Sequence, residues 1–331
     1  MPNSMRRTLN PAGTPLNTIR FILALFVVYV VWGSTYPAIK ILVAPPEGVG
    51  LPPTLAAGIR LSIAGSALLA AGYVHGKVTK GPVRVVTARQ FRTALIAGLL
   101  LSLGSGALVA HASQHVDSGV MATIMALAPI ATTIVSSAST RRAPLPRVFL
   151  GLLAGLAGVA LLIGPDSNFT SFGLAAALAA ALFWAVGSWY LIRADAPTQS
   201  WVTAGIGSFV GGVGLCSYAA LAGEFSVIEA VRIDQRSWLA LIYLSAVSLV
   251  GLNCYTWLLR HAGSSLTTSH AFVNPVVAAV LGIVIADDSA STQVLLAAAL
   301  VGTGAFLAGL PESNRIRPAP EPAEDPSVKI R

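Results

Sequence analysis

Residues 115–165 read HVDSGVMATIMALAPIATTIVSSASTRRAPLPRVFLGLLAGLAGVALLIGP, and residues 261–311 read HAGSSLTTSHAFVNPVVAAVLGIVIADDSASTQVLLAAALVGTGAFLAGLP. The two stretches align without a gap, and five residues recur 146 positions later: His115, Ser118, Pro129, Gly158 and Pro165 as His261, Ser264, Pro275, Gly304 and Pro311. The chain therefore contains an internal repeat, in which the second half is similar in sequence to the first. Because each half contains five long apolar stretches, an odd number, we expect the second half to enter a membrane from the opposite face, as an inverted repeat.

Apolar stretches occupy most of the chain. Its 331 residues are 55% hydrophobic and 10% charged, with a mean hydropathy of +0.74, which is outside the range of soluble globular domains. A helix crosses a bilayer core with about 20 apolar residues, and runs that are apolar on all sides are unlike barrel strands. The sequence predicts an all-α integral membrane protein with ten transmembrane helices, over residues 21–43, 54–74, 92–110, 118–140, 148–164, 172–192, 202–222, 238–259, 266–286 and 294–310.

These spans divide the chain into four segments. Residues 1–20 form a cytoplasmic N-terminal segment, residues 21–164 the first five-helix repeat and residues 172–310 the second. The last segment, residues 311–331, is rich in proline and charge and cannot bury enough apolar surface to fold. We expect it to be a disordered cytoplasmic tail.

The net charge of +8 is unevenly distributed along the predicted topology. Seventeen of the 21 Lys and Arg residues lie on the side that holds both termini, whereas Lys40, Arg232 and Arg236 lie on the other side and Arg60 lies inside a span. The positive-inside rule therefore places both termini in the cytoplasm. The basic residues are not clustered as a nucleic-acid partner would require, so the lipid bilayer is the expected partner.

Motifs for catalysis or cofactor binding are missing from the sequence. It contains no P-loop, no H-E-x-x-H and no G-x-S-x-G, and its two cysteines lie within apolar segments. We expect no cofactor and no metal. None of the thirteen acidic residues falls well inside a span, so proton coupling would need a histidine or a boundary acid such as Asp117.

Two ionisable residues lie inside predicted spans. A cation within a membrane helix costs about 2.5–3.5 kcal/mol, so Arg60 must be compensated, either by an anionic group of a substrate in a water-filled cavity or by snorkelling and helix carbonyls. His270 precedes Pro275 by five residues, and its counterpart in the first repeat is Ile124. It is a candidate site residue, with helix packing as the alternative.

Aromatic and hydroxyl groups gather near the bilayer centre in the first and sixth spans. Walls of this composition suit a small amphipathic solute, although aromatic packing explains part of the pattern. Polar residues of the eighth and ninth spans complete the candidate substrate site. Together with Arg60 and His270, the site consists of Trp32, Ser34, Thr35, Tyr36, Trp184, Ser188, Asn253, Tyr255 and Asn274.

Prolines lie near the middle of the fourth and ninth spans. Pro129 and Pro275 each remove one helix hydrogen bond and kink the helix. Because the freed carbonyls can face a cavity, and because both prolines recur in the repeat, we predict a role in gating. A packing bend is the alternative.

Three stretches resemble the EamA-type branch of the drug/metabolite transporter superfamily: Trp32 to Tyr36, Gly58 with Arg60, and Ser269 to Pro275. The resemblance extends from about residue 20 to 310. It implies a plasma-membrane carrier of small metabolites, often an amino-acid exporter, with a central cavity between the two halves and alternating access. The chain departs from the family pattern at His270, where an aromatic residue is more usual.

The leading functional hypothesis is a secondary transporter or facilitator that moves a small zwitterionic or anionic metabolite across the inner membrane. One alternative is a membrane-embedded enzyme acting on a lipid-linked substrate, with His270 and Arg60 as catalytic groups. Another is a scaffold or sensor that transports nothing. Oligomeric state, coupling ion and direction of transport are not encoded in recognisable motifs.

Overall fold

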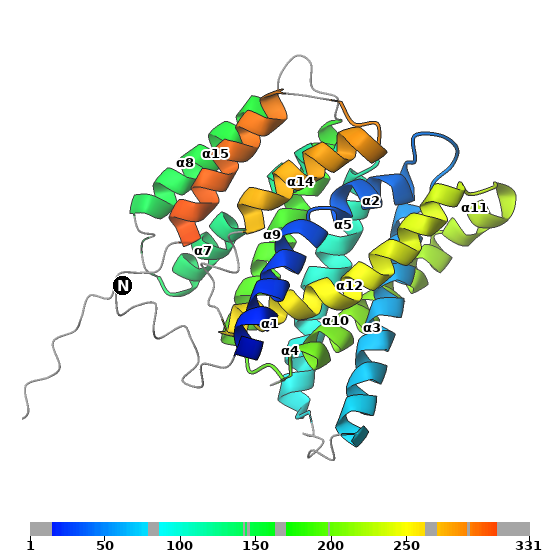
Figure 1. Ribbon diagram of the computed structural model, residues 1–331, viewed down its shortest axis with the longest axis horizontal. Helices are drawn as coiled ribbons and strands as arrows, with labels where there is room; N and C mark the ends of the chain where they lie inside the picture. Colours follow the sequence, from blue (N-terminus) through cyan, green and yellow to red (C-terminus); the bar gives the residue numbers. More distant parts are fainter. Residues whose placement is uncertain are drawn as a thin grey trace, which may run out of the picture.

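The computed structural model describes residues 15–78, 86–141, 143, 146–162, 170–197, 199–261, 270–289 and 292–309. Within these ranges the chain is almost entirely helical (Figure 1). The one extended pairing that they contain is an isolated parallel bridge between Val49 and Ile233. The predicted N-terminal segment up to residue 14 and the predicted tail lie outside the described residues.

The first repeat consists of α-helices and two π-helical segments, η1 and η2. Its elements are α1 (Pro15–Phe26), η1 (Val27–Val31), α2 (Thr35–Val43), α3 (Pro53–Val78), α4 (Ala88–Gly98), η2 (Leu99–Ser105), α5 (Gly106–Ala112), α6 (Ser118–Met125), α7 (Ala128–Ser139) and α8 (Pro146–Leu162). The elements of the second repeat are α9 (Ser171–Arg193), α10 (Ser200–Leu221), α11 (Glu224–Ala230), α12 (Gln235–His261), α14 (His270–Ile285) and α15 (Thr292–Gly309).

Local sequence signals explain several helix ends. Thr87 and Gln90 form a capping box at the start of α4, since each side chain bonds the backbone N–H of the other residue. Thr170 caps α9 by accepting a hydrogen bond from the Gly173 N–H, at 3.0 Å. Between α10 and α11 the chain turns at Gly223, whose φ of +75° a residue without a Cβ adopts readily.

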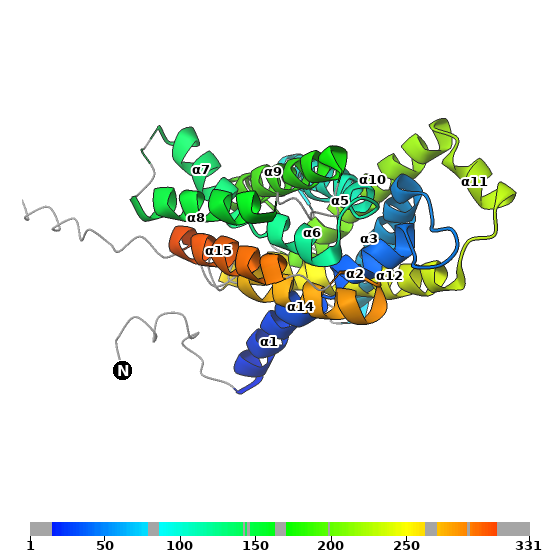
Figure 2. The same ribbon diagram turned by 90° about the horizontal axis from the view of Figure 1, so that it is seen from above.

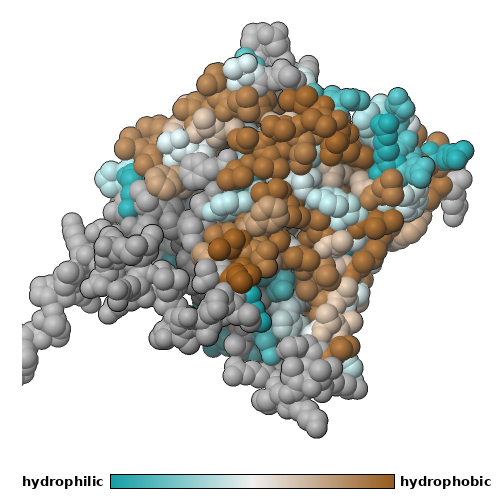
Figure 3. Space-filling model, in the orientation of Figure 1, coloured by the Kyte–Doolittle hydropathy of each residue, from teal (hydrophilic) through white to brown (hydrophobic). Residues whose placement is uncertain are grey.

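Six helices are long and apolar enough to cross a membrane: residues 53–74, 88–112, 118–139, 171–193, 201–221 and 235–255. The bent pair Ile19–Val31 and Thr35–Val43 makes a seventh if it is one span. Shorter apolar helices lie at residues 146–162, 273–285 and 292–307, where the fifth, ninth and tenth spans were predicted. Large apolar side chains cover much of the outside of the bundle (Figure 3). The protein is a multi-pass membrane protein.

Equivalent helices of the two repeats pack against each other and run antiparallel. Along the pair α3 and α10, successive glycines of α3 meet residues in descending order: Gly58 meets Cys216, Gly65 meets Phe209 and Gly72 meets Trp201. A Cβ at Gly65 would lie 2.3 Å from the backbone nitrogen of Phe209, so the two backbones touch there. Small residues permit this close approach.

The pair α8 and α15 repeats the arrangement at the edge of the molecule (Figures 1 and 2). A Cβ at Gly304 would lie 2.4 Å from the Gly151 carbonyl oxygen, and Gly158 meets Val301. The order of these contacts again makes the two helices antiparallel. A third equivalent pair, α6 and α14, meets at Gly119 and Ala279.

One further set of helix contacts is exchanged between the repeats. Helix α12 packs against η1 and α2, and its counterpart in the first repeat, formed by α4, η2 and α5, packs against α9. Three equivalent pairs and one exchanged set of contacts are what a pseudo-twofold axis between the repeats would produce.

Three predicted spans are not continuous α-helices. The first is interrupted at residues 32–34 and bends by 41° between its two parts. The third contains the π-helical segment η2. The fourth is interrupted by a turn at Ala126 and Leu127, just before Pro129. Such breaks are tolerated in a membrane only where the freed backbone groups find other partners.

Candidate functional site

Hydroxyl groups of the first span form hydrogen bonds to backbone carbonyls at the break in that span. Ser34 Oγ donates to the Val31 carbonyl and Thr35 Oγ1 donates to the Trp32 carbonyl, both at 2.6 Å. The Ser34 hydroxyl also lies 2.5 Å from the hydroxyl of Tyr243 on α12. These two predicted site residues therefore donate to carbonyls at the break, and the Trp32 carbonyl also accepts a hydrogen bond of 3.0 Å from the Thr35 N–H. Their role as substrate ligands stays a prediction.

Helix α14 packs directly onto this break. A Cβ at Gly33 would lie 2.8 Å from Val277 Cβ and 3.2 Å from Asn274 Cα. The buried Asn274 amide nitrogen donates to the carbonyl oxygens of Val28 and Tyr29, at 3.1 and 2.7 Å. Its orientation follows from these neighbours, because only the nitrogen can donate to two acceptors. The second repeat thus supplies the partners for the π-helical segment η1.

Four rings meet beside the break, and they come from both repeats. The Trp32 centroid lies 5.3 Å from that of Trp184, 5.0 Å from that of Tyr255 and 5.4 Å from that of His270. Trp184 and Tyr255 are 5.4 Å apart. The pairs are tilted or edge-to-face, the geometry that aromatic rings prefer. We call Trp32, Trp184, Tyr255 and His270 the aromatic cluster.

Polar groups line part of the aromatic cluster. The hydroxyls of Ser188 and Tyr255 share a hydrogen bond of 3.1 Å, and both residues are buried. Gly251 lies under the Trp32 indole, whose Nε1 would be 3.5 Å from a Cβ at that position. The cluster therefore offers aromatic faces, a hydroxyl pair and an imidazole, groups that can bind a small amphipathic solute.

Three other predicted site residues are not among the four rings of the aromatic cluster. Tyr36 packs against a different apolar core, which includes Leu42 and Leu61. Asn253 lies on α12 two positions before Tyr255, and hence on another face of that helix. Arg60 lies on α3, largely buried, and its Nε has no hydrogen-bond partner in the described part of the chain.

The two predicted gating prolines occupy different local settings. Pro129 lies in the first turn of α7, where a missing N–H costs nothing, directly after the turn that separates α6 from α7. Pro275 lies inside α14, next to Asn274. Both prolines thus adjoin an interruption or a contact between the repeats. A gating role stays a prediction.

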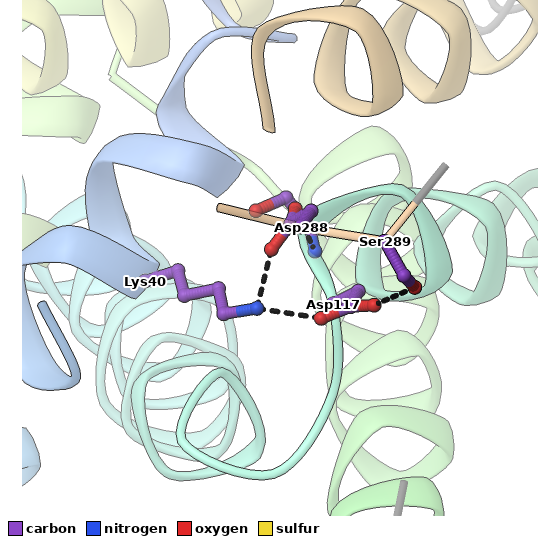
Figure 4. Close-up of polar contacts among 5 residues, drawn as sticks. Lys40, Asp117, Asp288 and Ser289 are labelled. Carbon is purple, nitrogen blue, oxygen red and sulfur yellow. Dashed lines mark hydrogen bonds and ion pairs between the residues drawn. The ribbon is translucent and has the colours of Figure 1, made fainter. Parts of the chain in front are cut away.

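A cluster of ion pairs was not predicted as a unit. Lys40 of α2 reaches Asp117, which precedes α6, and Asp288, which follows α14 (Figure 4). The sequence carried a signal, because all three residues were expected on the same side of the membrane, opposite the termini. We call the end of the bundle that holds them the Lys40 end.

The ion pairs are extended by hydrogen bonds. Lys40 Nζ lies 2.5 Å from Asp117 Oδ1, and Ser289 Oγ donates to Asp117 Oδ2 at 2.8 Å. Burial by itself would raise the pKa of the Asp117 carboxyl, but the hydrogen bonds from Lys40 and Ser289 and the charge of Lys40 outweigh it and hold that pKa below its ordinary value. Asp117 is therefore ionised in this arrangement.

Comparison with known families decides the class of protein. The sequence profile described as "EamA-like transporter family" matches the chain twice, over residues 19–164 and residues 171–310. The chain belongs to the EamA-like transporter family. This places it in the drug/metabolite transporter superfamily, as the resemblance in the sequence indicated. It is a membrane transporter, and its family name points to transport and not to catalysis.

Two curated relatives and one solved structure show the extent of the similarity. The uncharacterized inner membrane transporter YedA of Escherichia coli (strain K12) is 32% identical over 297 residues, which cover 86% of this chain and 91% of YedA. The uncharacterized transporter YoaV of Bacillus subtilis (strain 168) is 25% identical over 174 residues, 51% of this chain and 56% of YoaV. A crystal structure with 22% sequence identity shares the fold, with a TM-score of 0.57 over 88% of this chain and 96% of that one.

Proposed function

We propose that the protein exports a small zwitterionic or anionic metabolite, such as an amino acid, across the inner membrane by alternating access. Two inverted five-helix repeats with ten membrane spans would rock against each other around a site at their interface. The antiparallel packing of α3 with α10 and of α8 with α15 supports the inversion. The three shorter apolar helices support the count of ten.

The distribution of basic residues supports an orientation. The Lys40 end carries only three of the chain's Lys and Arg residues, whereas the opposite end and the terminal segments carry seventeen. The positive-inside rule then directs the Lys40 end outward and both termini into the cytoplasm. The inner-membrane name of the relative YedA supports the same membrane.

The aromatic cluster is the proposed substrate wall, and one observation carries this proposal. Trp32, Trp184, Tyr255 and His270 come from four predicted spans and from both repeats, and they meet where the first span is broken. A site at the interface of the repeats can change its exposure when the repeats move relative to each other. Ser188 and Asn274 belong to the same region.

Arg60 is the proposed partner of a substrate carboxylate. Its guanidinium is largely enclosed by protein, and its Nε has no hydrogen-bond partner among the described residues. A buried donor without a partner is costly, and an incoming carboxylate would satisfy it through a charge-assisted hydrogen bond. Such a bond contributes about 1.5–3 kcal/mol, so its loss weakens binding by roughly 10- to 100-fold.

Counterflow in proteoliposomes tests the proposed function. Purified protein would be reconstituted with a panel of unlabelled amino acids and small carboxylic acids inside, and uptake of the labelled compounds would be measured against empty liposomes. We expect exchange of at least one compound. Arg60→Gln should raise its KM by roughly 10-fold or more, from the loss of the charge-assisted bond.

A matched pair of tryptophan substitutions separates the site from the surface. Trp184→Leu removes one ring of the aromatic cluster and should lower exchange strongly, whereas Trp238→Leu changes a ring that is 40% exposed at the start of α12 and should not. Equal effects of the two substitutions, or exchange of no compound in the panel, would contradict the proposal.

A further inference from the structure

Among the described residues, the only ion pairs are those that Lys40 makes, and they join the two repeats. Lys40 on α2 and Asp117 at the start of α6 belong to the first repeat, and Asp288 after α14 belongs to the second. Three segments that are far apart in the sequence are therefore held at one point (Figure 4). The Ser289 hydroxyl adds a fourth group from the second repeat.

The Asp288 carboxylate is buried and accepts a hydrogen bond in addition to its ion pair with Lys40. Its side chain is only 3% exposed, and its Oδ2 accepts a hydrogen bond of 2.8 Å from the Ser118 N–H at the start of α6. The carboxylate thus caps a helix of the other repeat, where the helix dipole favours a negative charge. Gly282 makes room for it, since a Cβ there would lie 2.1 Å from Asp288 Oδ2.

The helices joined in this way are the equivalent pair α6 and α14. Below the ion pairs, Gly119 of α6 packs against Ala279 of α14, and a Cβ on Gly119 would lie 3.0 Å from the Ala279 Cβ. These two helices occupy matching positions in the repeats and carry Pro129 and Pro275 in or next to them. A path between the repeats at the Lys40 end can open only if they separate there.

Further hydrogen bonds close the same end. Glu224 accepts from the Leu55 N–H at 2.8 Å, and Ser237 donates to the Ile41 carbonyl at 3.0 Å, each across the repeat boundary. At the opposite end, the described contacts between repeats include neutral or singly charged hydrogen bonds, such as Arg193 to Ser136 at 3.0 Å, but no ion pair.

The cluster has no repeat-related copy. In the gapless register of 146 residues, Asp117 corresponds to Gly263 and Asp288 to Arg142. The repeat therefore does not encode a second copy of this cluster at the opposite end. A buried ion pair that loses one partner leaves an uncompensated charge, so this end resists opening more than a neutral contact would.

We propose that Lys40, Asp117 and Asp288 are the gate residues of the Lys40 end, and that their ion pairs must break once in each transport cycle. The proposal rests on the alternating-access function proposed above. It assigns the closing of one end to named side chains, which the sequence-based candidates Pro129 and Pro275 do not do. Lys40→Met keeps the length of the side chain and removes its charge, so the two carboxylates repel each other and that end opens more often.

Labelling of a buried cysteine measures this opening without a substrate. Cys216 and Cys254 would be replaced by alanine, and Thr123→Cys would be introduced one turn below Gly119 on the same face of α6, where Thr123 is completely buried. A charged, membrane-impermeant maleimide would be added to membranes from each side. We expect Lys40→Met to speed labelling from the side of the Lys40 end by about 10-fold, within the 5- to 150-fold range of a typical coupling energy.

Control variants separate the gate from general loosening. Lys40→Arg keeps the charge and should label at close to the parental rate, and Arg236→Met removes an exposed cation at the same end and should have no effect. Asp117→Asn is the second test variant if Lys40→Met does not fold, because it keeps the shape and an acceptor for Ser289. Faster labelling with Lys40→Met or Asp117→Asn, but not with Arg236→Met, supports the gate.

Unchanged labelling in both test variants would overturn the gate assignment. The outcome is independent of the substrate test, because labelling needs no substrate. A protein that exchanges amino acids but labels at the same rate in every variant loses the gate and keeps the function. One that labels faster in the variants but exchanges no compound keeps the gate and loses the proposed substrate class.

Discussion

The contact between Asn274 and the π-helical segment η1 can be tested by one substitution. Asn274→Leu keeps the volume of the side chain but removes the amide that donates to the Val28 and Tyr29 carbonyls, at 3.1 and 2.7 Å. Lipid supplies no donor that could replace this amide. We therefore expect the broken first span to lose two of its hydrogen bonds to the second repeat.

The magnitude follows from the number of bonds lost. A side-chain hydrogen bond contributes about 0.5–1.5 kcal/mol net, and those measured inside a membrane average about 0.6 kcal/mol. The loss of two bonds then gives about 1–3 kcal/mol of destabilisation. At about 2–4 °C per kcal/mol, the thermal midpoint should fall by several degrees.

Thermal unfolding in a fixed detergent measures this shift, and Thr303→Val is a suitable control. The Thr303 hydroxyl is exposed and donates only to Ala299 of its own helix, at 2.7 Å, so its loss should change Tm by less than about 1 °C. Asn274→Asp should be at least as harmful as Asn274→Leu, because a carboxylate offers acceptors and no donor. Equal Tm values for Asn274→Leu and the parent protein would refute the role assigned to Asn274.

Three further predictions follow from other contacts. Gly304→Val places a side chain against the Gly151 carbonyl, and we expect a loss of about 1–3 kcal/mol or failure of the pair α8 and α15 to pack, seen as a lower Tm or aggregation on size-exclusion chromatography. Tyr255→Phe removes the hydrogen bond to Ser188 but keeps the ring, so Tm should fall by an amount equivalent to about 1 kcal/mol while the near-UV circular dichroism of the tryptophans is unchanged. The pKa of Asp117 lies below its ordinary value of 3.8, so its ion pair stabilises the folded protein above that pH and is lost as the pH falls through the lower pKa of the folded state. The difference in Tm between the parent protein and Asp117→Asn should therefore be constant near pH 6 and shrink only below about pH 4, and a difference that already shrinks near pH 6 would contradict this.

Much of the architecture could be predicted because lipid imposes a simple rule on sequence. Apolar runs of membrane length have to be helices, and six of the predicted spans coincide with helices long enough to cross. Gly151 and Gly155, like Gly207 and Gly211, have the four-residue spacing that lets two helices approach closely, and all four lie at such contacts. Family membership was indicated by three stretches in order along the chain: Trp32 to Tyr36, Gly58 with Arg60, and Ser269 to Pro275.

The breaks inside spans could not be predicted from hydropathy. Residues 27–34 are apolar enough to continue a helix, and a window average does not register whether their hydrogen bonds are of the α or the π type. The partner that makes the break tolerable, Asn274, comes from the other repeat, about 240 residues away in sequence. Ser34 and Thr35 were singled out as polar groups in lipid, but their bonds to helix carbonyls were not foreseen.

The candidate site was predicted in part. Trp32, Trp184, Tyr255 and His270 come together in the structure, whereas Tyr36 packs in another apolar core. Arg60 lies on α3 and is not one of the four rings. Lys40, Asp117 and Asp288 were each assigned to the outer side without being combined. Their meeting depends on how three loops pack, and loop packing leaves no periodic pattern in a sequence.

The interruption of the first span has a consequence for movement. An intact helix that bends in lipid has to give up backbone hydrogen bonds, at several kcal/mol for each group left unsatisfied. At residues 32–34 the helix is already interrupted, and Ser34, Thr35 and Asn274 donate hydrogen bonds to carbonyls at or near the break. A change of angle between α1 and the part that carries Lys40 would therefore give up fewer backbone hydrogen bonds than the bending of an intact helix.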